Sequence, residues 1–189
     1  ATRVGGHPDP HTVVSVSPIN SAYMPRSGDL IVGFVAEVRN NLWFFDVNGP
    51  FQALLPMSLA PWKVEFGSTR KHLGIGDAAL ARIQEVDETH NMVLTMKGVG
   101  LRRLNEGAVL SIPVNLIDTL RGDNNSMVSR IRDVTDCRII VGDNGRVWVH
   151  GSSDDMRVAR ELIQTLNEEG HKNTFESAVK ALENERGEH

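Results

Sequence analysis

The sequence after residue 107 restricts the fold most, because its apolar residues change between strand spacing and helix spacing in a fixed order. The successive patterns are a strand, a helix, a Gly-bearing loop, a second helix, a hairpin and a third helix, in the stretches 109–114, 115–120, 122–125, 126–135, 137–150 and 154–169. Asn144-Gly145, between two apolar runs, is a signal for a two-residue hairpin turn. The order β-α-loop-α-β-β-α predicts an α+β unit.

The preceding part, residues 28–97, contains only strand patterns. Five short runs rich in β-branched and aromatic residues alternate with turn residues, at 29–38, 42–47, 51–57, 79–87 and 92–97. Five such strands predict a small barrel of the oligonucleotide-binding (OB) type. The fold class expected for the whole chain is therefore mainly β followed by α+β.

Changes in composition divide the chain into four expected parts. Before the barrel, residues 12–25 alternate apolar and polar side chains and contain two prolines, which is typical of an edge strand and a connector. In the tail, Phe175, Val179 and Leu182 recur at helical spacing, which predicts a short helix that packs either on the preceding unit or on a neighbouring protein. The expected parts are a β-rich remnant, the barrel, the α+β unit and the tail helix, at 1–26, 27–104, 105–168 and 169–189.

The overall charge gives no general support for nucleic-acid binding. Lys and Arg number 20 against 24 Asp and Glu, a formal net charge of −4, whereas nucleic-acid-binding domains usually carry a surplus of basic residues. Any such binding therefore has to be local. The single cysteine, Cys137, allows no internal disulfide, and neither a signal-peptide pattern nor an apolar run of about 18 residues is present. We expect a cytoplasmic protein without membrane contact.

The motifs, taken in order, resemble two RNA-binding modules. Gly122-Asp123-Asn124-Asn125 stands between two helical patterns, where a KH domain normally has Gly-x-x-Gly. The runs GDLIVGFVAEV, WFFDV and EVDETHNMVLTMK resemble the S-one RNA-binding barrel, which is named after a ribosomal protein. Together with YMPRSGDLIVG, GLRRL, SMVSRI and IIVGDNGRVWVHG, they resemble the archaeal exosome cap subunit of the S-one/KH type, from about Val13 to Leu166.

This resemblance implies a non-catalytic subunit with an S-one-type OB-fold barrel and a type I KH domain. Such subunits form a trimeric cap on a hexameric ring of phosphorolytic RNase subunits, bind single-stranded RNA and lead its 3′ end into the ring for degradation. The family also has a complete β-rich N-terminal domain that docks on the ring, and only residues 12–25 resemble its last part. The implied partners are RNA and the ring subunits, with three copies per complex and no cofactor.

The loop between the first two helices is one candidate RNA site. Its candidate contact residues are Gly122, Asn124, Asn125 and Arg130. An intact Gly-x-x-Gly loop lets the backbone approach a phosphodiester, and N–H groups of the next helix accept the negative charge. Asn125 can keep the turn because Asn tolerates left-handed angles, but its Cβ reduces the room, and Asp123 adds a negative charge. The alternative is that Asn125 or Ser126 only caps the helix.

The barrel offers two further candidate sites. The resemblance to S-one barrels matches Phe44, Asp87 and Asn91 to the base-binding face, where Phe44 either stacks on bases or instead faces the core. In the connection between the third and fourth strands, the candidate residues are Lys63, Arg70, Lys71 and His72. This basic run is either a solvated surface or, in three copies around a pore, an electrostatic funnel that binds RNA in a salt-sensitive way.

No arrangement of residues predicts catalysis or a metal site. His7 and His11 have helical spacing, but the prolines between them prevent a helix, and no Cys or His cluster completes a zinc site. Two alternatives to a cap subunit remain: a free-standing RNA-binding regulator and a fragment of a phosphorolytic nuclease. Nucleases that carry these modules usually place the KH unit before the barrel, which is the reverse of the order here.

Overall fold

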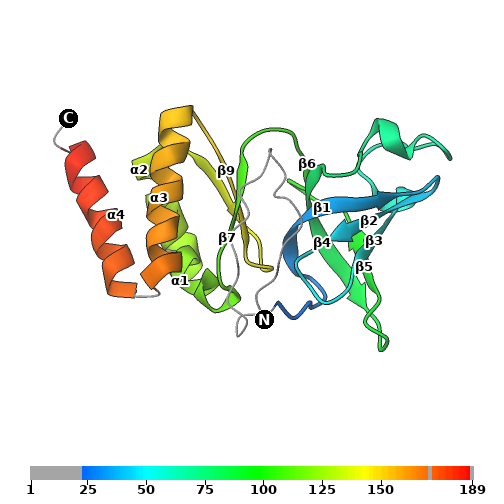
Figure 1. Cartoon of the computed structure of the whole chain (residues 1–189), viewed down its shortest axis with the longest axis horizontal. Coiled ribbons are helices and arrows are strands. Elements are labelled where there is room, and N and C mark those ends of the chain that lie inside the picture. The colour runs from blue at the N-terminus through cyan, green and yellow to red at the C-terminus, as the bar shows by residue number, and fades with distance from the viewer. Residues whose placement is uncertain (1–22, 170–171, 188–189) are drawn as a thin grey trace. The chain divides into compact units, whose positions relative to one another are not determined.

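The computed structural model describes residues 23–169 and 172–187, which divide into two compact units (Figure 1). Residues 23–106 and Gly142–Arg146 form the barrel unit, and residues 107–141 and 147–187 form the α+β unit. The expected N-terminal remnant, 1–26, with its edge strand, lies almost entirely outside the described residues. Within the described ranges, no helix is both long enough and apolar enough to span a bilayer.

The barrel unit is built on five strands that close on themselves, as the sequence predicted. They are β1 (Leu30–Val38), β2 (Leu42–Asp46), β3 (Ala53–Pro56), β4 (Ala78–Val86) and β5 (Met92–Thr95). Their order is β1-β2-β3-β5-β4, with β3 and β5 parallel, and β1 pairs with β4 to close the barrel (Figure 1). A short strand, β6 (Arg102–Leu104), also pairs with β4.

Alternation along the strands decides which side chains fill the barrel. Trp43, Phe45 and Leu55 are fully buried, because successive residues of a strand point to opposite faces. Phe44 and Leu54, which are paired directly across β2 and β3, are only partly buried. The outer face of these two strands is therefore apolar in part and accessible.

The long connection between β3 and β4 is anchored to the barrel. It contains two 3-10 turns, Met57–Leu59 and Thr69–Lys71. Leu73 is fully buried, and its carbonyl accepts a 3.0 Å hydrogen bond from Nε1 of Trp43. Thr69 is also buried and donates its hydroxyl to the carbonyl of Arg39. These anchors on either side fix the position of the basic residues between them.

The α+β unit has the predicted order of strands and helices. Its elements are β7 (Ala108–Ser111), α1 (Ile117–Arg121), α2 (Ser126–Thr135), β8 (Arg138–Val141), β9 (Arg146–His150), α3 (Ser153–Glu169) and α4 (Lys172–Gly187). The strands form one sheet in the order β7-β9-β8, and the helices lie on one side of it (Figure 1). The first helix starts later than predicted, because Val114–Leu116 forms a 3-10 turn after Pro113.

One apolar core joins the helices of this unit to its sheet. Met127 and Ile131 of α2 and Ile163 of α3 are buried in it, within the stretches for which helical spacing was predicted. Phe175 and Val179 of α4 are fully buried in the same core. Burying two such side chains contributes about 3–6 kcal/mol. The tail helix therefore packs on its own unit, which settles the alternative that the sequence left open.

The β8–β9 hairpin is present, but the predicted two-residue turn is wrong. The loop has three residues, since the Gly142 N–H donates to the Arg146 carbonyl at 2.8 Å, and only Gly145 has a positive φ there. A two-residue type I′ turn requires positive φ at both positions. Asn144 does not adopt one because its fully buried side chain is hydrogen-bonded within the barrel unit, to the backbone of Val32 and Val47.

Candidate nucleic-acid interface

Phe44 lies on the outer face of the barrel rather than in its core, the two placements that the sequence left open. The guanidinium carbon of Arg39 lies 5.1 Å from the centroid of the Phe44 ring. Arg39 also forms a 3.0 Å ion pair with Glu37. An accessible ring can stack on a base, and here Glu37 balances the charge of the neighbouring Arg39. The geometry of Phe44 is thus compatible with its expected role on RNA.

Asp87 and Asn91 are bound to each other within the β4–β5 turn. The Asp87 carboxylate accepts hydrogen bonds from the backbone N–H groups of Asn91 (2.8 Å) and Thr89 (2.9 Å) and from the Asn91 side chain (3.1 Å). The backbone hydrogen bond from Asn91, and next the Thr89 hydroxyl, lower the pKa of Asp87. The pair shapes this turn, and a contact with RNA remains a prediction.

The same turn carries an aromatic pair that sequence reasoning missed. His90, at a φ of 64°, stacks on Phe51 with ring centroids 5.9 Å apart and 13° between their planes. Phe51 belongs to the β2–β3 connection and is 55% exposed. The two residues meet because β3 and β5 are neighbours in the barrel, a long-range pairing that neither local sequence reveals.

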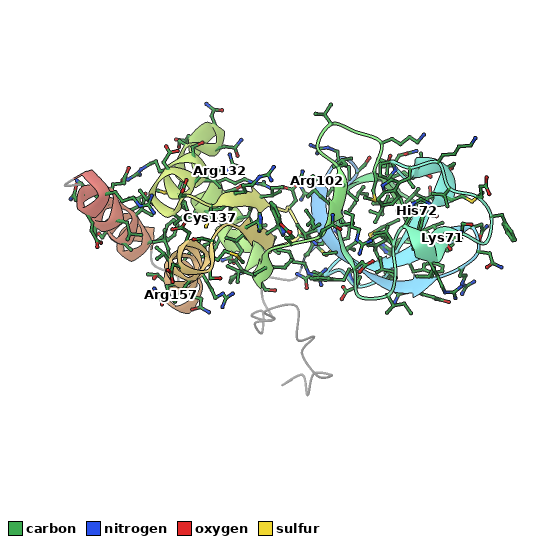
Figure 2. The ribbon with its side chains drawn as sticks, turned by 90° about the horizontal axis from the view of Figure 1, so that it is seen from above. Lys71, His72, Arg102, Arg132, Cys137 and Arg157 are labelled. Atoms are coloured by element: carbon green, nitrogen blue, oxygen red, sulfur yellow. The ribbon has the colours of Figure 1, made fainter. Side chains whose placement is uncertain are left out.

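The basic run of the β3–β4 connection lines an open pocket of about 420 Å³ in the barrel unit. Its walls are Pro61, Trp62, Lys71, His72, Leu101, Arg102, Arg103 and Asn105. The rings of Trp62 and His72 are stacked, with centroids 5.1 Å apart and 19° between their planes. Lys71, His72 and Arg102 are labelled in Figure 2. Of the predicted basic residues, Lys71 and His72 line this pocket, whereas Lys63 and Arg70 are exposed beside it on the same connection.

Strand β6 supplies two arginines to this pocket that were not among the candidate residues of the sequence. Arg103 donates to the His72 carbonyl at 3.1 Å and forms a 3.3 Å ion pair with Asp77. Arg102 donates to the Gly100 carbonyl at 3.0 Å. The only local signal was the pair of adjacent basic residues in GLRRL, and the pairing of this short strand with β4 is what brings them to the pocket.

The loop between α1 and α2 depends on its one remaining glycine. Gly122 has a φ of 70°, and a Cβ there would lie 2.7 Å from the Cβ and N of Met127. Asn124 and Asn125 have positive φ values of 51° and 63°, as expected of Asn in such a turn. The alternative of a side-chain cap is wrong for Asn125, because left-handed angles replace the extended ones of a capping residue and no capping bond forms. Ser126 is the first residue of α2 rather than its cap.

Arg130 of α2 is paired with Glu183 of α4. Two hydrogen bonds join the guanidinium and the carboxylate, the longer of them 3.3 Å between Nε and Oε2. This pairing raises the pKa of Arg130 and lowers that of Glu183. Arg121 is also engaged, since it donates to the Val141 carbonyl at 2.7 Å. Contact between Arg130 and RNA remains a prediction.

The described residues offer no arrangement for a metal ion, in that no three His, Cys, Asp or Glu side chains among them converge on one point. Cys137 is buried, and burial raises the pKa of its thiol. The accessible groups include aromatic and basic side chains, which suit binding to a single-stranded nucleic acid.

Comparison with known proteins agrees with the architecture of both units. Residues 107–165 match the KH domain family. A crystal structure of a proposed exosome complex RNA-binding protein superposes with a TM-score of 0.76 and 28% identity, over 87% of this chain and 97% of that one. Exosome complex component Rrp4 of Picrophilus torridus is 33% identical over 89% of this chain and 73% of its own length. The Rrp4 of Thermoplasma acidophilum is also 33% identical, over 92% and 75% respectively.

A closed S-one-like barrel followed by a KH domain, with accessible aromatic and basic groups, defines an RNA-binding protein of modular type. Both modules are contained in the match to the Rrp4 proteins, which covers most of the chain. The chain belongs to the exosome complex component Rrp4 family and is an RNA-binding subunit of the exosome. This confirms the resemblance found in the sequence and the fold class that it implied.

Proposed function

We propose that this protein is a non-catalytic cap subunit of an exosome, which binds single-stranded RNA and guides its 3′ end into a ring of phosphorolytic RNase subunits. The observation that carries the proposal is the similarity to Rrp4 through both RNA-binding modules of one chain. In this role three copies surround the entrance of the ring, in the cytoplasm and without a cofactor. The ring performs the 3′-to-5′ degradation, and the cap supplies the RNA.

Three groups of residues contact RNA in this proposal. Bases stack on Phe44, and the turn of Asp87 and Asn91 borders the same barrel face. The exposed Lys63 and Arg70, with Lys71 and His72, attract the phosphates. Gly122, Asn124 and Asn125 of the KH loop add a backbone contact, and Arg130 joins them. Each contact is weak by itself, and three copies raise the effective affinity because one strand meets several sites.

The proposal is tested by purifying the protein from its own cell lysate at moderate salt, after RNase treatment, and identifying the bound proteins by mass spectrometry. Stoichiometric recovery of the phosphorolytic ring subunits is the expected result. Recovery of the protein alone contradicts the cap role and favours the alternative, a free-standing RNA-binding regulator.

Catalysis is tested separately on the purified protein. A labelled RNA with a free 3′ end is incubated with inorganic phosphate, with and without reconstituted ring subunits. We expect no phosphate-dependent shortening by the protein alone, and faster shortening by the ring when the protein is added. Release of nucleoside diphosphates by the protein alone would identify it as a nuclease fragment.

A further inference from the structure

We propose that the pocket between the β3–β4 connection and β6 binds one nucleotide unit of single-stranded RNA, with the base on Trp62 and the phosphate at Lys71. This inference rests on the proposed RNA-binding function and goes beyond it, since it assigns a discrete site away from Phe44. The pocket's volume of about 420 Å³ lies within the range of about 300–1,000 Å³ that is usual for small-ligand sites.

The aromatic wall of this pocket is suited to a base. Trp62 is half-buried, and one side of its ring is stacked on His72 at 5.1 Å. A base can extend this stack on the side that His72 does not cover, because every base has a π-face and stacking is tolerant of sequence. The side chain of Asn105, also on the wall, has an amide that can donate or accept a hydrogen bond at a base edge.

The basic wall is suited to the phosphate. Lys71 is exposed and makes no ion pair within the described residues, so its ammonium group is available for an anion. Arg103 balances Asp77 in an ion pair of 3.3 Å, so its main effect is to fix the pocket wall. Arg102 contributes a second positive charge from β6. The pocket thus combines aromatic rings with cations, which match the two chemical parts of a nucleotide.

The pocket is formed before a ligand arrives, which lowers the entropic cost of binding. Arg103 donates to the His72 carbonyl at 3.1 Å and so joins β6 to the connection. On the same connection, Thr69 and Leu73 flank the pocket residues Lys71 and His72 and are anchored to the barrel, Leu73 through the 3.0 Å bond from Trp43. His72, whose ring stacks on Trp62, is thus held in place both by β6 and by the anchored β3–β4 connection.

Tryptophan fluorescence of the full chain provides a direct measurement at this site. The chain has three tryptophans, of which Trp43 and Trp148 are buried at 0% and 4% exposure. Trp62 is the half-buried one, so an RNA base stacked on it quenches the accessible part of the signal. Titration with a short uridine oligonucleotide should give saturable quenching, and the affinity is checked by fluorescence anisotropy of a labelled oligonucleotide.

Four variants separate stacking from charge and from folding. Trp62→Ala should weaken oligonucleotide binding about tenfold, while Trp62→Phe keeps a ring and most of the affinity. Lys71→Ala should lower the slope of log affinity against log salt by about 0.7, the value for one phosphate contact on a single strand. Lys97→Ala is the matched control, because Lys97 is an exposed lysine of the same unit outside the pocket wall. Since the exposed Lys71 side chain contributes little to packing, that variant remains informative even if Trp62→Ala fails to fold.

The outcomes decide the site and its ligand. Wild-type affinity and salt slope in Lys71→Ala overturn the assignment, and so does undiminished binding by a folded Trp62→Ala. Equal affinity for uridine monophosphate and for the oligonucleotide would make the pocket a free-nucleotide site, and quenching by inorganic phosphate alone would remove the role of the base. If the wild type binds no RNA, the assignment also falls. Association with ring subunits is measured without RNA, so failure of the pocket is distinct from failure of the cap role.

Discussion

The buried amide of Asn144 allows a quantitative test of the barrel unit. Its nitrogen donates to the carbonyls of Val32 and Val47, both at 2.9 Å, and its oxygen accepts from the Val32 N–H at 3.3 Å. The residue is fully buried, so water does not readily replace these bonds. Asn144→Ala removes all three and is therefore expected to destabilise the barrel unit.

The size of the effect follows from the groups that lose a partner. The Val32 carbonyl keeps a 3.2 Å hydrogen bond from Arg146. The Val32 N–H and the Val47 carbonyl lose their bonds to Asn144, and each buried group without a partner costs about 1–3 kcal/mol. Because the bond from Val32 is long, we expect a loss of about 2–4 kcal/mol in the free energy of unfolding. This is a large part of the roughly 5–15 kcal/mol that stabilises a typical domain.

The assay has to report on the barrel unit alone, because a chain of two units need not unfold in one step. Replacing Trp62 and Trp148 by Phe leaves the buried Trp43 as the fluorescent reporter, and urea unfolding is then compared with and without Asn144→Ala. Asn41→Ala, at an exposed asparagine of the same unit, is the matched control. Hydrogen exchange at the Val32 amide should accelerate in the Asn144 variant. Unfolding within about 0.5 kcal/mol of the control, the usual range for surface substitutions, would refute the reasoning.

Three further substitutions test the α+β unit. Gly122→Ala should lower the free energy of unfolding by at least about 2 kcal/mol, because the φ of 70° disfavours any side chain and the Cβ would lie 2.7 Å from Met127. Thermal unfolding measures this loss, and an unchanged melting temperature contradicts the loop geometry. Glu183→Gln should cost at most about 0.5 kcal/mol at neutral pH, since the pair with Arg130 is well exposed. The pKa of Glu183 is lowered in the folded state, so the stabilisation by this ion pair should be present at neutral pH and disappear as the pH falls through that lowered pKa. If wild type and Glu183→Gln lose stability equally in acid, the pair makes no such contribution. Asn125→Gly should restore room for a phosphodiester and strengthen RNA binding in anisotropy measurements, while unchanged affinity would mean that the loop does not touch RNA.

The strands of the barrel could be predicted because their signal is local. The run 92–97 became β5 over Met92–Thr95, and 29–38 became β1 over Leu30–Val38. Period-2 alternation and turn residues are contained in each short stretch, and only pairing required long-range information. The α+β unit was predictable for the same reason, since helical spacing over 126–135 located α2 correctly.

The orientation of β2 could not be predicted from alternation alone. The strand contains three consecutive aromatic residues, Trp43, Phe44 and Phe45. Alternation places them on two opposite faces but does not say which face is buried. The closure of the barrel decides it, with Trp43 and Phe45 in the core. The Asn144-Gly145 turn failed for a similar reason, because the hydrogen bonds of Asn144 to Val32 and Val47 override the local preference.

Only some of the residues that line the pocket could be predicted from the sequence. Lys71 and His72 stand in a visible basic run, whereas Arg102 and Arg103 belong to a strand of three residues that has no recognisable pattern. Such a short strand forms because it pairs with β4, and its partners are more than 20 residues away in the sequence. Residues brought together by pairing of this kind leave no local trace.

The distribution of ion pairs explains how a chain with a net charge of −4 can bind RNA. In the α+β unit, acidic side chains pair with some of the arginines, Glu183 with Arg130 and Asp155 with Arg186 at 3.6 Å, and in the barrel unit Arg39, Arg103 and Arg146 are paired in the same way. In the barrel unit, Lys71 carries no such partner within the described residues. Because phosphate binding depends on local positive charge rather than on the net charge of the chain, we expect the salt-dependent part of RNA affinity to reside in the barrel unit. From the KH loop, with Asp123 beside its asparagines, we expect only backbone contacts, whose strength varies little with salt.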